Sequence, residues 1–411
     1  MLKAYLGRWI FLFAVILSSL IIGLKVAIAF FHFLFWFLAS IVVVNLAWLA
    51  IEYFGTRLDL VRKIINRAQE DEVLEIEAMI KNEGFLPAFN LVLEDNLSCA
   101  KVGEKKKLFL LEFLGTASFL KRRYNCLCPE RGKYRIGPFA LYFFDPLGLF
   151  FLKKTYYIYS ETFIYPLTFS IKKFPDLIKG IPPWFGIETT RVSADEDEFF
   201  GVREYKEGDP IKRIHWLSTA RKNQLIVKQF QRQTFFRATI VFNLAKAQNF
   251  GQGKERVAEY IIKIAASVAK YLIERDISLE IIANTGEIIR IPFNRGPEHL
   301  EDILKFLSLA QAESKVSLGE IFAGFSRSIP NDTTLIVIML DKEWQHLRAM
   351  LPLEKRNISL IPLILISSTF LYSFEKKEVV KDVKIKLSKM FNFTPIVFSR
   401  GDNLEEVILK Y

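Results

Sequence analysis

Cysteine and histidine are scarce in this chain. Its 411 residues include three cysteines, Cys99, Cys126 and Cys128, and four histidines. The cysteine number is odd and no cysteine–histidine spacing matches a metal site, so neither a disulfide framework nor a zinc finger is expected. The cysteines instead indicate a reducing compartment. Cys126 and Cys128 could bind a metal or sense redox state, but the alternation of a β-strand explains their spacing equally well.

Motifs of known catalytic chemistry are also missing. The chain contains no Gly-x-Ser-x-Gly elbow, no His-Glu-x-x-His helix and no P-loop. The usual sequence signals of α/β-hydrolases, zinc proteases and P-loop NTPases are therefore absent. We expect no cofactor, and we expect that the chain is not an enzyme.

Apolar residues, by contrast, are abundant. They make up 51% of the chain, 38 residues are phenylalanine, and the mean hydropathy is +0.21. These values are high for a purely soluble protein. The formal net charge is +11. Because the basic residues are scattered rather than grouped in runs, an anionic membrane surface explains them more simply than nucleic acid, and no nucleic-acid partner is expected.

Much of the apolar excess lies near the N-terminus. Residues 6–24, apart from Arg8, and residues 26–51 are apolar stretches separated by Lys25. The first is just long enough to span a bilayer and the second is amply long. A cleaved signal peptide followed by one span is the alternative, but no small-residue cleavage site precedes Lys25. Residues 1–55 are therefore predicted to form a transmembrane helical hairpin that anchors the chain in a lipid bilayer.

Basic residues flank this predicted hairpin, whereas its turn offers only Lys25. The flanking residues are Lys3, Arg8, Arg57, Arg62, Lys63 and Arg67. By the positive-inside bias, both ends of the hairpin face the cytoplasm. The expected location is the inner (cytoplasmic) membrane of a bacterium or archaeon, with a multi-pass anchor and the bulk of the chain in the cytoplasm.

Within residues 56–165, the stretch from 71 to about 165 has a period of two. Residues 73–80 alternate between apolar and polar, and further short runs follow at 89–93, 107–111 and 121–126. Short alternating runs at such spacing are typical of a β-sandwich. This region is predicted to be a small antiparallel β domain, sandwich-like, that serves as a spacer or docking surface.

Strands and helices alternate across residues 237–411. Apolar strands are predicted at 238–242, 333–340 and 358–366, and an amphipathic helix at 254–275. Almost wholly apolar strands are typical of a parallel sheet covered on both faces. The order of elements predicts an α/β doubly wound domain, so the whole chain is expected to be multidomain.

A connector, residues 166–236, contains the most distinctive stretch of the chain. In it Gly208, Asp209 and Pro210 are a turn signal, and Asp209 is suited to accept hydrogen bonds from nearby backbone N–H groups. The other notable residues of this signature stretch are Arg203, Tyr205, Arg213, Trp216, Ala220 and Arg221. Arginine pairs with carboxylates in a bidentate manner. The three arginines therefore either hold a loop across Asp209 and neighbouring carboxylates, such as the acidic run 195–198, or form an anion site or a docking face for an acidic partner.

Two further functions are conceivable for this stretch. A hydrolase would use His215, Ser218 and Asp209, but nearness in sequence is a weak argument for a triad, which is defined by spatial geometry. An anion or nucleic-acid site would use the stretch from Arg203 to Arg221, with its aromatic side chains stacking on bases. The membrane tether and the lack of a basic run weigh against nucleic acid.

The spacing of these residues resembles the signature of the family called domain of unknown function 58 (DUF58): Arg203-x-Tyr205-x-x-Gly208-Asp209-x-x-x-Arg213-x-x-Trp216-x-x-x-Ala220-Arg221, followed by Leu225-x-Val227. The resemblance extends to the layout of two spans, a β region and a domain similar to von Willebrand factor A. Members of this family are commonly associated with MoxR-type AAA+ ATPases. The resemblance implies a membrane-tethered scaffold or adaptor for such an ATPase, in complex assembly or envelope maintenance, and implies no known reaction.

The chain departs from the von Willebrand A pattern at one place. That fold holds a divalent cation with Asp-x-Ser-x-Ser after its first strand, whereas this chain has Asn243, Ala245 and Ala247 there. Asp341 matches the later aspartate of the site. One carboxylate and one amide are a poor ligand set for a hard cation, and Lys246 adds positive charge. No functional metal site is expected.

Overall fold

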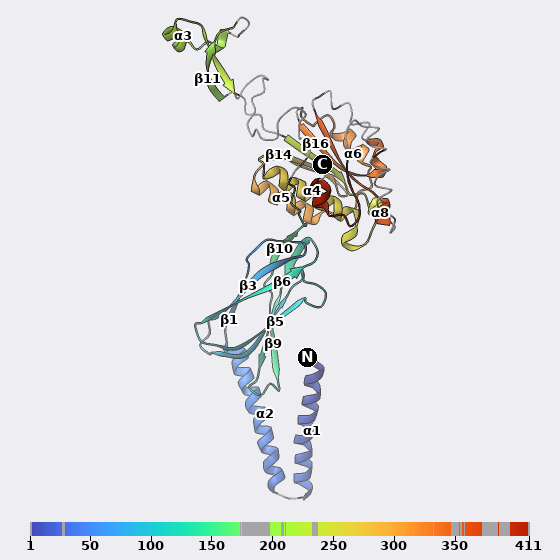
Figure 1. Ribbon diagram of the computed structural model, residues 1–411. Helices are drawn as coiled ribbons and strands as arrows, with labels where there is room; N and C mark the ends of the chain where they lie inside the picture. The colour runs from blue at the N-terminus through green and yellow to red at the C-terminus, as the bar shows by residue number, and fades with distance from the viewer. Residues whose placement is uncertain are drawn as a thin grey trace. The chain divides into compact units, whose positions relative to one another are not determined.

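The computed structural model describes most of the chain (Figure 1), namely residues 2–26, 29–172, 174, 198–206, 209, 211–231, 237–331, 333–346, 353, 356, 358–371, 385 and 395–409. The chain divides into two compact units, residues 1–167 with 307–309 and residues 168–306 with 310–411. The first unit holds two helices and three small sheets. The second holds a short hairpin and a six-stranded sheet.

Two helices begin the first unit, α1 (Leu2–Val26) and α2 (Ala29–Gly55). Within the described part of the chain, α2 is the one helix long and apolar enough to cross a membrane, and α1 contains a shorter apolar stretch, Ile10–Lys25. Ser19 Oγ donates a hydrogen bond to the carbonyl of Phe31 (3.0 Å), so the two helices contact each other near their connection.

The last turns of α2 pack against the β-rich region that follows. Leu49 is buried in its core, the rings of Tyr53 and Phe143 are 5.4 Å apart, and Glu52 Oε1 accepts a hydrogen bond from the backbone N–H of Phe89 (2.5 Å). The helix and the β-rich region therefore share one core rather than being joined by a loose linker.

Three sheets make up this β-rich region. One has the order β1-β3-β6, the second β5-β4-β8-β9 and the third β2-β10-β7. The strands are β1 (Leu58–Ile64), β2 (Ala68–Gln69), β3 (Glu72–Asn82), β4 (Ala88–Asn96), β5 (Lys106–Leu114), β6 (Phe119–Cys128), β7 (Gly132–Ile136), β8 (Phe139–Phe144), β9 (Phe151–Tyr156) and β10 (Ser160–Tyr165). Alternate residues of β3, such as Leu74 and Ile76, are fully buried, as its period of two predicts.

The prediction of a purely antiparallel domain is wrong in one detail. The short strand β2 pairs with β10 in parallel, with Ala68 opposite Ile164. A two-residue strand has no sequence period, so neither its existence nor its direction can be read from the chain. The other strand pairs of this region are antiparallel.

The larger sheet of the second unit is mixed. Its order is β15-β14-β13-β16-β17-β18, and all neighbours are parallel except the edge pair β14–β15. The elements are β13 (Arg237–Asn243), α4 (Val257–Ile273), β14 (Ser278–Asn284), β15 (Ile288–Asn294), α5 (Pro297–Leu309), α6 (Leu318–Phe325), β16 (Thr333–Leu340), β17 (Ser359–Leu365), α8 (Ser368–Leu371), β18 (Ile396–Phe398) and α10 (Leu404–Leu409). The parallel strands thus follow the order 2-1-3-4-5, which places the first and third side by side.

Burial of both faces explains why the central strands are almost wholly apolar. All eight residues of β16 are buried, as expected for a central strand with both faces covered. A charged residue also lies in this core, because the fully buried Glu280 of β14 pairs with Arg290 Nε of β15 (2.5 Å) and accepts a hydrogen bond from Thr239 Oγ1 of β13 (3.2 Å). This one carboxylate links three neighbouring strands, at the point where the register between β14 and β15 shifts.

A buried ion pair connects all three sheets of the β-rich region. Arg62 of β1 donates through Nε and Nη2 to both carboxylate oxygens of Asp95 of β4, and neither side chain is exposed to solvent. Arg62 Nη1 donates to the carbonyl of Ile136 at the end of β7 (2.9 Å), and the guanidinium carbon lies 4.0 Å from the centre of the Phe139 ring of β8. Tyr124 of β6 donates its hydroxyl to Asp95. The side chains of Arg62, Asp95 and Tyr124 therefore each have a hydrogen-bond partner in this network.

Burial and hydrogen bonding act in opposite directions on the pKa of Asp95. Removal from water raises the pKa of Asp95, and the hydrogen bonds and charge of Arg62, with the hydroxyl of Tyr124, offset only part of this effect. Burial also raises the pKa of Tyr124 well above its ordinary value, so its hydroxyl stays protonated and donates. The Asp95 carboxylate therefore depends on its contacts with Arg62 and Tyr124 rather than on contact with water.

We expect Asp95→Ala to lower the free energy of unfolding by about 3–5 kcal/mol, because it leaves the Arg62 charge buried without a partner. Arg123→Ala is the matched control: it breaks the Arg123–Glu77 pair (2.8 Å) between β6 and β3, where the arginine side chain is 76% exposed. Loss of that surface pair costs about 0–1 kcal/mol. Urea unfolding of the full chain in detergent, followed by circular dichroism, measures both values. Equal destabilisation by the two variants would contradict a structural role for the buried pair.

Candidate functional site

The signature stretch folds into a small hairpin module, which we define as residues 198–206, 209 and 211–231. It contains β11 (Glu198–Glu204), the 3-10 turn η1 (Ile211–Arg213), α3 (Trp216–Lys222) and β12 (Ile226–Gln231). The two strands pair antiparallel, with a bulge between Phe199 and Gly201. Ile214, Ile226 and Val227 are buried and form its small core.

Arg203 and Asp209 close the loop between β11 and η1. The arginine donates to both carboxylate oxygens, Nη1 to Oδ2 at 2.7 Å and Nη2 to Oδ1 at 2.6 Å. Asp209 Oδ2 also accepts a hydrogen bond from the backbone N–H of Lys206 (2.9 Å). These bonds, that of Arg203 foremost, lower the pKa of Asp209 to about 2. The carboxylate is thus ionised and structurally committed at neutral pH.

His215 caps helix α3. Its Nδ1 accepts a hydrogen bond from the backbone N–H of Ser218 (3.3 Å) and lies 2.7 Å from Ser218 Oγ. Asn223, with φ 54°, ends the helix in a left-handed conformation, where asparagine is tolerated better than most residues. In a catalytic triad the imidazole Nδ1 faces the carboxylate and Nε2 faces the serine. Here Nδ1 faces Ser218, and Asp209 is bonded to Arg203, so the geometry is that of a helix cap.

Exposed apolar side chains gather on η1 and the first turn of α3. The exposed fractions are 71% for Ile211, 65% for Trp216 and 63% for Leu217. Basic side chains on the same two elements are also exposed, namely Lys212, Arg213, Arg221 and Lys222. We call these seven residues the apolar–basic patch. Isolated exposed apolar residues are ordinary, whereas here three large ones lie between positions 211 and 217.

The positions predicted from the sequence divide between the interior of this module and its surface. Arg203, Tyr205 and Asp209 are half-buried, whereas Arg213, Trp216, Ala220 and Arg221 are exposed. Gly208 and the acidic residues 195–197 lie outside the described residues. Sequence reasoning missed Ile211 and Leu217. Their signal was a large apolar side chain just before a short, otherwise polar helix, Ile211, and another in its first turn, Leu217.

A second candidate lies where the parallel strands of the mixed sheet end. Asn243 ends β13 and Asp341 follows the neighbouring strand β16, so the first and third parallel strands place both side chains at the same edge. Ala245 forms a bridge with Ser314, and Ala247 lies in the 3-10 turn Lys246–Gln248.

Hydrogen bonds engage two of the polar groups at this edge. Asn243 Nδ2 donates to the carbonyl of Val316 (2.8 Å), and Asp341 Oδ1 accepts from the backbone N–H of Ser367 (3.0 Å). Asn243 Oδ1 is buried and has no hydrogen-bond partner in the described ranges. A small pocket beside Asn243 is lined mostly by apolar side chains, including Leu244, Ala245, Val257, Ile261, Ala312 and Leu340. Its polar lining consists of the amides of Asn243, Gln248 and Asn249 and includes no carboxylate, whereas hard cations favour several oxygen ligands with carboxylates among them.

A family comparison matches part of this chain. The family described as "Protein of unknown function DUF58" matches residues 201–351, from the hairpin module to beyond β16. A DUF58 domain lies here. The DUF58 domain includes the apolar–basic patch as well as Asn243 and Asp341, and it leaves out α1, α2 and the β-rich region.

Comparisons with other proteins give little further guidance. No curated protein matches the chain. Among solved structures, the CARDB domain of a Pyrococcus furiosus protein in complex with di-metal ions is 15% identical, covering 27% of this chain and 87% of its own, with a TM-score of 0.20. The putative ApaA protein from Bordetella pertussis is 8% identical, covering 26% and 93%, with a TM-score of 0.19. Similarities of this size carry no argument about fold or function.

We expect Arg203→Gln to raise the pKa of Asp209 from about 2 towards the ordinary aspartate value of about 3.9. Because the folded-state pKa is lowered, the stabilisation by this pair is present above about pH 4 and is lost as the pH falls through about 2. A pH titration of the Asp209 carboxyl ¹³C shift, assigned with Asp209→Asn, measures the change. Arg221→Gln, an exposed arginine on α3, should leave the titration unaltered; an equal shift in that control would rule out the pairing as the cause.

Proposed function

We propose that this chain is a membrane-anchored cytoplasmic adaptor whose hairpin module binds a partner protein through the apolar–basic patch. The observation that carries the proposal is the exposure of Ile211, Trp216 and Leu217 together with four basic side chains. Tryptophan and arginine are enriched among the residues that dominate binding energy at protein interfaces. Basic side chains around an apolar centre favour a partner with a complementary acidic surface.

The anchor in this proposal is a transmembrane hairpin of α1 and α2. The apolarity of α2, the contact between Ser19 and Phe31, and the basic residues at both ends of the hairpin support it. Arg62 is an exception among those basic residues, because it is buried and paired with Asp95. The proposed location is the inner membrane of a bacterium or archaeon, multi-pass, with the β-rich region and the DUF58 domain in the cytoplasm.

A MoxR-type AAA+ ATPase is the proposed partner. The support is the resemblance of the signature stretch to a family commonly associated with such ATPases, together with the DUF58 match at residues 201–351. The parallel strand order 2-1-3-4-5 is that of a doubly wound sheet, the class to which the proposed von Willebrand A-like fold belongs. In this role the chain supports complex assembly or envelope maintenance and catalyses no reaction of its own.

Crosslinking from the patch tests the partner directly. With a photoreactive phenylalanine analogue in place of Leu217, irradiation of native membranes should yield a crosslink to an AAA+ ATPase subunit, identified by mass spectrometry. The same analogue in place of Ile288, a 46% exposed residue of β15, is the matched control and should give no such product. Trp216→Ala should weaken binding of the purified ATPase by about 2 kcal/mol, or roughly 30-fold, as expected for a hot-spot residue. The adaptor role fails if Leu217 yields no partner, or if Trp216→Ala binds as tightly as the unaltered chain.

The orientation in the membrane can be tested separately. We expect protease added to intact bacterial spheroplasts to leave the chain whole, because residues after α2 face the cytoplasm. The same protease added to inverted membrane vesicles should digest the β-rich region and the DUF58 domain. Immunoblotting with a C-terminal tag distinguishes the results, and cleavage in intact spheroplasts would place these regions on the opposite side.

A further inference from the structure

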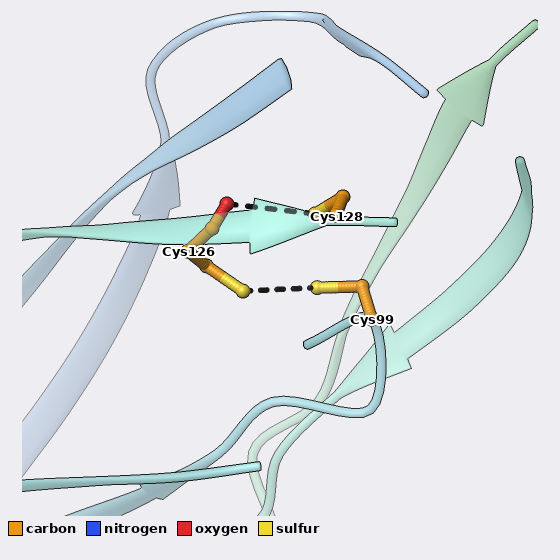
Figure 2. A group of neighbouring side chains, drawn as sticks. All are labelled: Cys99, Cys126 and Cys128. Carbon is orange, nitrogen blue, oxygen red and sulfur yellow. Dashed lines mark hydrogen bonds between the residues drawn. The ribbon is translucent and has the colours of Figure 1, made fainter. Parts of the chain in front are cut away.

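All three cysteines of the chain lie together in the β-rich region. Cys99, Cys126 and Cys128 are free thiols, and each is buried. Their three sulfur atoms lie within 4.8 Å of one another. Figure 2 shows the side chains of Cys99 and Cys126 pointing towards each other. Cys128 lies nearby, on the same strand as Cys126. The fold has thus brought every thiol of a 411-residue chain to one point.

Two separate elements supply these thiols. Cys126 and Cys128 are alternate residues of β6 and therefore lie on its buried face, whereas Leu127 between them is 42% exposed. Cys99 lies on the turn between β4 and β5. That turn is closed by hydrogen bonds from Leu97 N to the carbonyl of Lys105 (2.7 Å) and from Ala100 N to the carbonyl of Leu97 (3.2 Å).

The separations suit sulfur ligands of one metal ion. Cys99 Sγ and Cys126 Sγ are 3.6 Å apart. Thiolates that share a metal ion at about 2.3 Å lie ~3.8 Å from one another. Small rotations of the side chains are therefore enough to direct three sulfur atoms at one ion, without a change in the backbone.

Packing alone is the plainer explanation, since a buried free cysteine behaves as a small apolar residue. Packing, however, gives no reason for the only three cysteines of the chain to share one site, because alanine or valine fill such positions equally well. A shared ligand role does give that reason. Thiolates are soft ligands and select ions such as Cu(I) and Zn(II).

The ligand set distinguishes between these two ions. Structural Zn(II) sites are almost always four-coordinate. No histidine, aspartate or glutamate joins the three thiols in the metal-ligand cluster found among the described residues. A soft monovalent ion with three sulfur ligands fits this set better than Zn(II) does.

We propose that Cys99, Cys126 and Cys128 form a Cu(I) site. As each Cu–S bond forms, an S–H bond breaks and its proton passes to solvent, so the copper stays monovalent and no electron is transferred. The ion enters by local opening of the turn that holds Cys99. Ser98 and Lys101, on the same turn, are exposed. The site is independent of the proposed adaptor role, because it lies in the β-rich region, outside the DUF58 match.

Competition with bicinchoninate tests the site on the full chain in detergent. Under anaerobic, reducing conditions we expect one Cu(I) per chain to be retained against this chelator. Cys99→Ser, Cys126→Ser and Cys128→Ser should each lower the affinity at least about 100-fold, since loss of an outer-shell partner alone costs 10–100-fold. Leu127→Ser is the matched control: it alters the same strand at an outward position, removes no sulfur and should bind as the unaltered chain does.

X-ray absorption of the copper-loaded, unaltered chain keeps the test decisive if a serine variant does not fold. Three sulfur neighbours around copper support the site, whereas nitrogen or oxygen neighbours overturn it. Loss of the copper to bicinchoninate, or equal affinity in the serine variants and Leu127→Ser, also overturns it. Retention of Zn(II) in preference to Cu(I) overturns the assignment of the ion.

Discussion

The packing of the β-rich region depends on one buried charge, that of Arg62, which must be paired. Arg62 can lie in this core only because Asp95, the carbonyl of Ile136 and the ring of Phe139 surround it. These three partners come from β4, β7 and β8, Arg62 itself lies on β1, and Tyr124 of β6 completes the network. An unpaired buried charge is strongly unfavourable, so any arrangement of the three sheets that separates these residues is excluded. The pair therefore contributes specificity of packing more than net stability.

Ion pairs elsewhere in the chain have different consequences according to their exposure. The buried Glu280 joins β13, β14 and β15 through Thr239 and Arg290, where the register of the antiparallel edge pair shifts. The Arg203–Asp209 pair is only partly buried and closes a loop instead. Trp216 lies apart from the small core of Ile214, Ile226 and Val227 and is exposed.

Much of the architecture could be read from the chain because it depends on local patterns. A period of two predicts β3, and an unbroken apolar run predicts the buried strand β16. The apolarity of α2 is equally visible. The short parallel strand β2 could not be predicted, because its two residues, Ala68 and Gln69, pair with a strand more than ninety positions away. The four-part domain division stays a prediction, while the contacts of the chain separate two units.

The sequence by itself determined which segments are apolar, which alternate, and which carry the spacing of the signature stretch. Tertiary structure alone decided which of those residues meet. Arg62 reads as one more charge beside a membrane span, yet it is buried with Asp95. Asp209, close to His215 in sequence, is bonded to Arg203. Cys99 joins two cysteines 27 and 29 positions away (126 − 99 and 128 − 99). Contacts between distant positions depend on strand pairing and on satisfying buried polar groups, and neither leaves a local pattern.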